Sequence, residues 1–277
     1  MRFACADQSA CPLRRRTPEA DLRFGLWQEQ GGPCGVIAAV QAYVLAQLLF
    51  EQPRAAERGG AEALLEPSDA QRDEALVLAL AHILWQAGQQ RRAVVLLRQG
   101  SESVTSRNFE SATVKYTFDT LPATQDFLRS RLGVIKEEEG CFVTLLMYSA
   151  LFSRGLDEVK ADMDVASNTM IAAHGYCSQE VVTLLLTGKA HSNVFDGTLE
   201  GVMDTPMMGI TSRCAVGYLT LVEALNEGYI TVGDNYKRPR WPVYVICSES
   251  HYSVLFGLVS RAIIAGIWVA FFQECQQ

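Results

Sequence analysis

The longest apolar pattern of the chain runs through residues 34–50, CGVIAAVQAYVLAQLLF. The residues that recur there at helical spacing are Val36, Ile37, Val40, Val44 and Leu48. This spacing predicts a buried helix of about four to five turns. A second helical pattern follows Ser68, with Gln71 three residues later as a capping-box signal, and it ends at Gly88.

The pattern changes along the rest of the chain. Residues 93–97 and 112–118 are rich in β-branched and aromatic side chains, which predicts strands. Helices are expected over 124–132, 141–152, 179–186 and 215–226, and two further strands over 242–247 and 251–258. Helical patterns therefore come first and the clearest strands come late. This order predicts an α+β fold in one domain.

Composition narrows the class of protein. Of the 277 residues, 49% are apolar and 20% are charged, which excludes a disordered chain, a collagen-like repeat and a disulfide-stapled miniprotein. The formal net charge of −7 is opposite to that of a nucleic-acid-binding face. No nucleic-acid partner is therefore expected.

The chain shows no targeting segment that we can identify. Arg14 to Arg16 are not followed by the apolar core of a signal peptide, so a cytoplasmic or nuclear protein that is not secreted is expected. The apolar run 254–272 is interrupted by Ser260 and Arg261, so no membrane partner is expected either. The eight cysteines, with no C-x-x-C pair, are interpreted as separate thiols of a reducing compartment.

The chemistry-bearing stretch is QEQGGPCG, residues 28–35, directly ahead of the first helix. Its two adjacent glycines let a backbone approach a ligand closely, and Pro33 suits the opening turn of a helix. Cys34 then lies at the helix N-terminus, where the macrodipole and backbone N–H groups favour a thiolate. The same N–H groups could stabilise an oxyanion, with the Gln28 amide as a second donor.

A cysteine nucleophile needs a base, and His251 at the start of a predicted strand is the candidate. We expect its imidazole to face the helix terminus. Taken alone, a cysteine that opens a buried helix is more often a core residue, and a single strand histidine is more often structural. The glycine-rich surround of Cys34 and the combination with Gln28 favour catalysis. The order Gln, Cys on a helix, His on a strand is that of papain-like thiol hydrolases.

The other cysteines and histidines favour structural roles. His174 and Cys177 stand three residues apart, but a zinc site would need a second such pair, so a structural turn is favoured and no metal or cofactor is expected. His191 follows Gly-Lys-Ala in a loop and is expected in solvent. Cys141, Cys214 and Cys247 lie in apolar segments and are interpreted as packing residues.

Several long blocks resemble one known family. They are GGPCG with the helix after it, SDAQRDEALVLALAHILWQAG, AHGYCSQEVVTLLLTGKA, SNVFD and CSESHYSVLF. These blocks resemble the MINDY family of cysteine deubiquitinases, most closely the branch of its fourth member. The resemblance implies a papain-like-related cysteine protease fold, helix-rich in its N-terminal part with strands at the C-terminal end. It implies hydrolysis of isopeptide bonds in polyubiquitin, mainly lysine-48-linked, with ubiquitin and polyubiquitin as partners.

By the same resemblance Cys34 is the nucleophile, His251 the general base and acid, and Gln28 the oxyanion donor. The expected organisation is a loose segment 1–21, a catalytic domain 22–258 that is cut short at its C-terminal end, and an atypical apolar tail 259–277. No Asn or Asp follows His251, and Glu274 is the only carboxylate after it. Either a Cys–His dyad works with Gln28 alone, or an orienting residue has been lost with the missing end.

Two other functions remain open from the sequence. One is an inactive or weakly active ubiquitin-binding isoform that keeps the site but lacks the C-terminal strands. The other is a thiol acyl-transfer enzyme acting on another class of substrate, which requires the resemblance to be coincidental.

Overall fold

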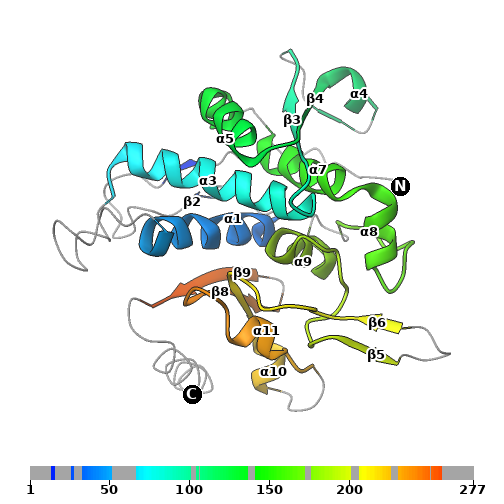
Figure 1. Ribbon diagram of the computed structural model, residues 1–277. Coiled ribbons are helices and arrows are strands. Elements are labelled where there is room, and N and C mark those ends of the chain that lie inside the picture. Colours follow the sequence, from blue (N-terminus) through cyan, green and yellow to red (C-terminus); the bar gives the residue numbers. More distant parts are fainter. Residues whose placement is uncertain are drawn as a thin grey trace.

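A central helix, α1 (Cys34–Ala46), lies between a layer of helices and a small sheet (Figure 1). The computed structural model describes residues 14–15, 26–27, 33–51, 67–100, 104–105, 107–136, 141–171, 176–200, 206–225, 230–249 and 251–257. Helices α3 (Asp69–Ala87) and α9 (Gln179–Thr187) contact α1 on one side, and strands β8 (Val243–Ser248) and β9 (His251–Phe256) contact it on the other.

The predicted first helix is confirmed, and it is buried on every face. Within α1 only Cys34 and Gln41 are partly exposed, and a π-helical turn, η1 (Gln47–Glu51), continues it. By length and composition the 18-residue stretch Cys34–Glu51 could cross a membrane, but 78% of it is buried inside the fold. A helix that is apolar all round is also what the middle of a protein core requires.

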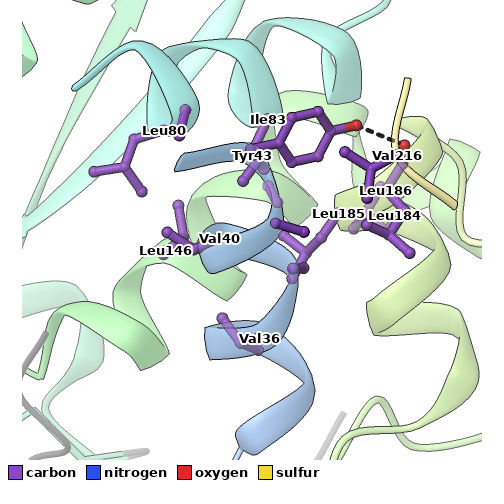
Figure 2. Packing of buried hydrophobic residues seen from close by; sticks show 14 of the residues in the cluster. Val36, Val40, Tyr43, Leu80, Ile83, Leu146, Leu184, Leu185, Leu186 and Val216 are labelled. Atoms are coloured by element: carbon purple, nitrogen blue, oxygen red, sulfur yellow. Dashed lines mark hydrogen bonds between the residues drawn. The ribbon is translucent and has the colours of Figure 1, made fainter. Parts of the chain in front are cut away.

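Hydrogen bonds join helices α1, α3 and α9 near their C-terminal ends. The Tyr43 hydroxyl of α1 donates to the Leu186 carbonyl of α9 at 2.8 Å, as Figure 2 shows. The Gln86 amide of α3 donates to the Tyr43 hydroxyl at 3.0 Å and to the Leu185 carbonyl at 2.6 Å. Burial raises the pKa of Tyr43, so this phenol stays protonated and keeps donating. Tyr43 belongs to a buried cluster that also contains Val36, Val40, Leu80, Ile83, Leu146 and Val216 (Figure 2).

The capping box predicted for the second helix is confirmed. The Ser68 side chain accepts from the Gln71 N–H, the Gln71 side chain accepts from the Ser68 N–H, and α3 ends at Gly88. Beyond α3, strands β3 (Ala93–Arg98) and β4 (Thr113–Phe118) form an antiparallel pair, as the composition predicts. Helix α3 contacts this pair, as do α4 (Phe109–Ala112), α5 (Leu121–Ser130) and α7 (Phe142–Arg154).

The sheet below α1 has three strands in the order β7-β8-β9. Strand β7 (Gly217–Thr220) pairs parallel with β8, and β8 pairs antiparallel with β9 through a hairpin in which Ser248 faces His251. Glu249 in that turn has a φ of +55°. The main core takes one face of the sheet, including Val243, Val245, Tyr252, Val254 and Phe256.

The prediction of a helix over 215–226 is wrong for the first half of that segment. Those residues form β7 and then a short helix, α10 (Leu221–Leu225). Gly217 explains the difference, because a Cβ there would lie 2.4 Å from the Tyr244 ring and 2.6 Å from the Tyr236 carbonyl oxygen. The strand is therefore selected by close packing against β8, which no helical period along the sequence can reveal.

Several further elements were not predicted from the sequence. They are α6 (Leu132–Ile135), α8 (Leu156–Asp162), α11 (Asp234–Lys237) and two antiparallel strand pairs: β1 (Arg14–Arg15) with β2 (Leu26–Trp27), and β5 (Thr198–Glu200) with β6 (Pro206–Met208). The α+β class is confirmed, and a papain-like relationship stays a prediction. Most of the expected segments 1–21 and 259–277 lie outside the described residues.

Candidate active site

Cys34 is the first residue of α1 and lies at the border of the core. It is partly exposed, whereas the five residues after it are buried. Pro33 precedes the helix without a side-chain cap, and its carbonyl accepts the N–H of Val36 at 3.0 Å and of Ile37 at 3.4 Å. The helix therefore presents the thiol at its N-terminal end, as the sequence predicts.

Gly35 is where α1 meets its neighbours most closely. A Cβ on this residue would lie 2.9 Å from Val182 Cγ2 of α9. It would also lie 3.4 Å from Cys177 Cβ and 3.4 Å from Tyr252 Cδ2 of β9. The missing side chain therefore lets α9, Cys177 and β9 converge beside Cys34.

Cys177 belongs to this site, which the sequence analysis missed when it interpreted the residue as part of a structural turn. Its Cβ would lie 3.4 Å from a Cβ on Gly35, so its side chain lies against the first turn of α1. Burial is the main cause that raises the pKa of this thiol to about 12, and the Cys34 charge acts in the same direction. His174 lies outside the described residues.

His251, the proposed base, is the first residue of β9. The residue after it in β9 lies against the residue after Cys34, the proposed nucleophile, in α1. The Tyr252 ring lies against the first turn of α1, with Cδ2 3.4 Å from the position of a Cβ on Gly35. Because side chains alternate along a strand, His251 leaves β9 on the face opposite Tyr252, and it is exposed. The structure thus brings the backbone of β9 close to the start of α1, but the imidazole of His251 lies on the face of β9 that points away from α1.

A hydrogen bond from Tyr218 of β7 joins the sheet to the start of α9. Cys247 pairs with Tyr252 across the β8–β9 hairpin, and its thiol donates to the Glu249 carbonyl at 3.6 Å. The Tyr218 hydroxyl donates to Gln179 Oε1 at 2.9 Å. Burial, followed by the charge of Cys247, raises the pKa of both tyrosines, so both phenols stay protonated.

Gln28, the third residue predicted for the site, lies outside the described residues. Residues 26–27, just before it, are described: the backbone N–H of Leu26 donates to Gln41 Oε1 at 2.6 Å. This bond attaches β2 to the partly exposed side of α1, the side on which Cys34 is also exposed at the helix start.

The expectation that His191 is solvated is wrong. Its side chain is buried, and Nδ1 lies 2.5 Å from the Gly209 carbonyl oxygen. Cys214 is buried, as predicted for a packing residue, whereas Cys141 and Cys247 are partly exposed. Within the residues that the structure describes, no group of three or more His, Cys, Asp or Glu side chains could hold a metal ion.

Comparison with known proteins gives consistent matches. The conserved-domain model of the deubiquitinating enzymes MINDY-3/4 matches residues 8–266. The Mus musculus protein named "Probable ubiquitin carboxyl-terminal hydrolase MINDY-4" is 42% identical over 258 residues, which cover 86% of this chain. The Homo sapiens protein named "Ubiquitin carboxyl-terminal hydrolase MINDY-3" is 31% identical over 264 residues, which cover 84% of this chain.

The matched region is only part of these relatives. It spans 33% of the mouse protein and 56% of the human one. No solved structure matches the chain.

Proposed function

The chain belongs to the MINDY-3/4 family of deubiquitinating enzymes, and we propose that it is a thiol-dependent ubiquitin carboxyl-terminal hydrolase. Its substrates in this proposal are polyubiquitin chains, mainly those joined through lysine 48. The observation that carries the proposal is the placement of Cys34 at the start of a buried helix, directly beside the strand that His251 begins.

In the proposed reaction the Cys34 thiolate attacks the carbonyl carbon at the C-terminal glycine of ubiquitin. A tetrahedral intermediate forms, and the Gln28 amide donates a hydrogen bond to its oxyanion. His251, protonated by the Cys34 thiol, gives that proton to the departing lysine amine as the C–N bond breaks. Water activated by His251 then hydrolyses the thioester, which releases ubiquitin and restores the thiol.

The proposal requires a small movement of His251. This residue is the first of β9 and follows a tight turn, so only its pairing with Ser248 anchors it at that end. Rotation of the hairpin tip carries the imidazole from the outer side of β9 toward Cys34. The neighbouring Tyr252 pairs with Cys247 across the hairpin and keeps the strand in place meanwhile.

The outward position of His251 favours one second candidate, a protein that binds ubiquitin with little or no hydrolysis. Such a protein would need the same surface for ubiquitin but no productive Cys–His contact. The two candidates differ in the reactivity of Cys34 toward ubiquitin, so a single reagent separates them.

The test is ubiquitin that carries an electrophile at its C-terminus, with adducts read by intact-protein mass spectrometry. We expect one adduct on the wild-type chain and none on Cys34→Ala. The matched control is Cys141→Ala, which changes another partly exposed cysteine at the start of a helix, α7, and should leave labelling unchanged. Binding of ubiquitin without any adduct would support the second candidate and contradict hydrolysis.

A second variant tests the base. His251→Ala should lower the rate of polyubiquitin cleavage by about 100-fold or more, as expected for loss of a general acid–base. Ubiquitin affinity, measured by calorimetry, should change little because His251 makes no core contact. An equal loss of binding would show a structural histidine instead. Faster cleavage of lysine-63-linked than of lysine-48-linked chains would contradict the proposed linkage.

A further inference from the structure

We propose that the edge of β9 that faces away from β8 binds the C-terminal tail of ubiquitin as an added antiparallel strand. The inference rests on the proposed function, because it concerns how the substrate of that reaction is held. It assigns a role in substrate binding to backbone atoms of β9, in addition to the side chains discussed above.

The strand register shows which backbone groups of β9 point to this edge. The Gly257 N–H donates to the Pro242 carbonyl at 3.0 Å, and hydrogen-bonded pairs alternate with non-bonded ones along an antiparallel ladder. Every second residue of β9 therefore exchanges hydrogen bonds with β8: His251, Ser253 and Leu255. Tyr252 and Val254, which alternate with them, direct their backbone N–H and C=O groups toward the opposite edge.

This edge is open among the residues that the structure describes. The strand order β7-β8-β9 makes β9 an outer strand. Within the described part of the chain, no hydrogen bond joins the outward N–H or C=O of Tyr252 or Val254 to another residue. The edge therefore offers two donors and two acceptors at strand spacing, which is the arrangement that strand addition uses.

The edge leads to the proposed nucleophile. Helix α1 contacts β9 more extensively than β8, so it lies over the outer side of the sheet (Figure 1). Tyr252 Cδ2 lies 3.4 Å from the position of a Cβ on Gly35, the residue after Cys34. The carbonyl that Cys34 attacks must therefore arrive at the Tyr252 end of β9.

This position fixes the direction of the bound tail. Strand β9 runs from His251, beside the start of α1, to Phe256, farther along the sheet. A tail whose last residue lies at the start of α1 runs the opposite way, so it pairs antiparallel with β9, about 4.8 Å from it. Its terminal glycine has no side chain that could collide with the closely packed first turn of α1.

The length of the edge favours this occupant over β9 of a second copy of the chain. The outward groups of Tyr252 and Val254 make a short ladder, whereas a stable dimer buries about 1,200–2,000 Å² of surface. A tail needs less from the edge, because the rest of ubiquitin can contact the chain elsewhere.

The experiment is amide hydrogen exchange of the whole chain, read residue by residue by NMR, before and after labelling with the ubiquitin electrophile. In the free chain the Tyr252 and Val254 amides should exchange fast. In the adduct both should exchange about 10-fold more slowly or less, because each N–H gains an acceptor. The Ser253 and Leu255 amides, already bonded to β8, are the internal control and should change much less.

A variant tests the same edge by its effect on binding. Val254→Pro removes an outward N–H and leaves the ladder with β8 intact, which is how proline is tolerated on edge strands. The electrophile concentration for half-maximal labelling rate should rise about 3- to 10-fold, the effect of one lost hydrogen bond. Val254→Ala keeps the N–H but loses packing, so its rise should be much smaller. If the proline variant does not fold, the exchange experiment decides.

The outcomes are distinct. A wild-type chain that is never labelled would contradict the proposed function and, with it, this inference. A labelled chain whose Tyr252 and Val254 amides exchange as fast as before would leave the function standing and overturn strand addition. A folded Val254→Pro with the wild-type half-maximal concentration would overturn it too.

Protection of these amides in the free chain would also overturn the proposal. Protection that disappears on dilution would show that a second copy occupies the edge. Protection that is independent of concentration would show that another segment of the same chain covers it.

Discussion

At the scale of single residues, the site depends on side chains that are small or absent. Gly35 lets α9 and β9 approach the first turn of α1, with a would-be Cβ only 2.9 Å from Val182. Contacts that short are not found in folded proteins, so any substitution must push α1 away from one neighbour. The residue that would be displaced with it is Cys34.

We therefore expect Gly35→Ala to lower the free energy of unfolding by about 1–3 kcal/mol, the usual cost of overpacking a core. Labelling of Cys34 should fall with it. The matched control is Gly133→Ala in α6, where a Cβ meets nothing within 4 Å. That change should be neutral or stabilise by up to about 1 kcal/mol, because alanine favours helices. The measurement is urea unfolding of both variants. A higher stability of Gly35→Ala than of Gly133→Ala would contradict this prediction.

At the scale of elements, the β8–β9 hairpin holds the proposed base. Glu249 in its turn has a φ of +55°, a conformation that costs a residue with a side chain about 1–2 kcal/mol. Two-residue hairpins favour glycine or asparagine there, because their turn must match the strand twist. The turn is thus a strained point next to His251.

Glu249→Gly should relieve this strain and raise the free energy of unfolding by about 1 kcal/mol. Glu200→Gly is the matched control: Glu200 is an exposed strand glutamate without a positive φ, so the change should destabilise slightly. Thermal unfolding distinguishes the two. A loss of stability in Glu249→Gly equal to that of Glu200→Gly would show that the turn is unstrained.

At the scale of the whole molecule, one buried charged network joins distant segments. Arg154 of α7 makes a two-pronged ion pair with Asp162 of α8 at 2.7 and 2.8 Å. Asp162 also accepts the N–H of Ala190, and the adjacent His191 bonds Gly209 next to β6. Both charged partners are buried, so breaking the pair would leave an unpaired charge in the core.

This network makes stability depend on pH. Burial, helped by the positive charges of Lys189 and Arg154, lowers the pKa of His191 although Asp162 opposes the shift. The folded chain thus binds this proton more weakly than the unfolded chain does. Stability from this group is complete above about pH 6.5 and is lost as the pH falls below that value.

The measurement is the free energy of unfolding between pH 8 and pH 5 for the wild type and His191→Gln. Glutamine keeps a donor for the Gly209 carbonyl but does not titrate, so the variant should lose less stability on acidification. Parallel curves for the two proteins would mean that His191 does not titrate in this range. The quantity to compare is the slope of the free energy of unfolding against pH, because the substitution also changes packing, and therefore the absolute stability, at every pH.

Local patterns were enough to predict some elements. The helical spacing of 34–50, the Ser68–Gln71 capping box and the β-branched run at 93–97 act within a few residues, and the structure confirms all three. The strand β7 was mistaken for a helix, since a Tyr244 ring and a Tyr236 carbonyl fix its conformation from elsewhere in the chain. His191 was misplaced for the same reason.

The sequence by itself determined the family, the buried helix and Cys34 at its start, since these depend on neighbouring residues and on blocks that match relatives. Only the tertiary structure revealed that Cys177 lies against Gly35 at the opening of α1, because the two residues are more than a hundred positions apart along the chain. It also decided the side of β9 from which His251 emerges, which depends on strand register rather than on residue type. Packing between distant segments therefore assembles the site, whereas the residue types along the chain only indicate which side chains take part in it.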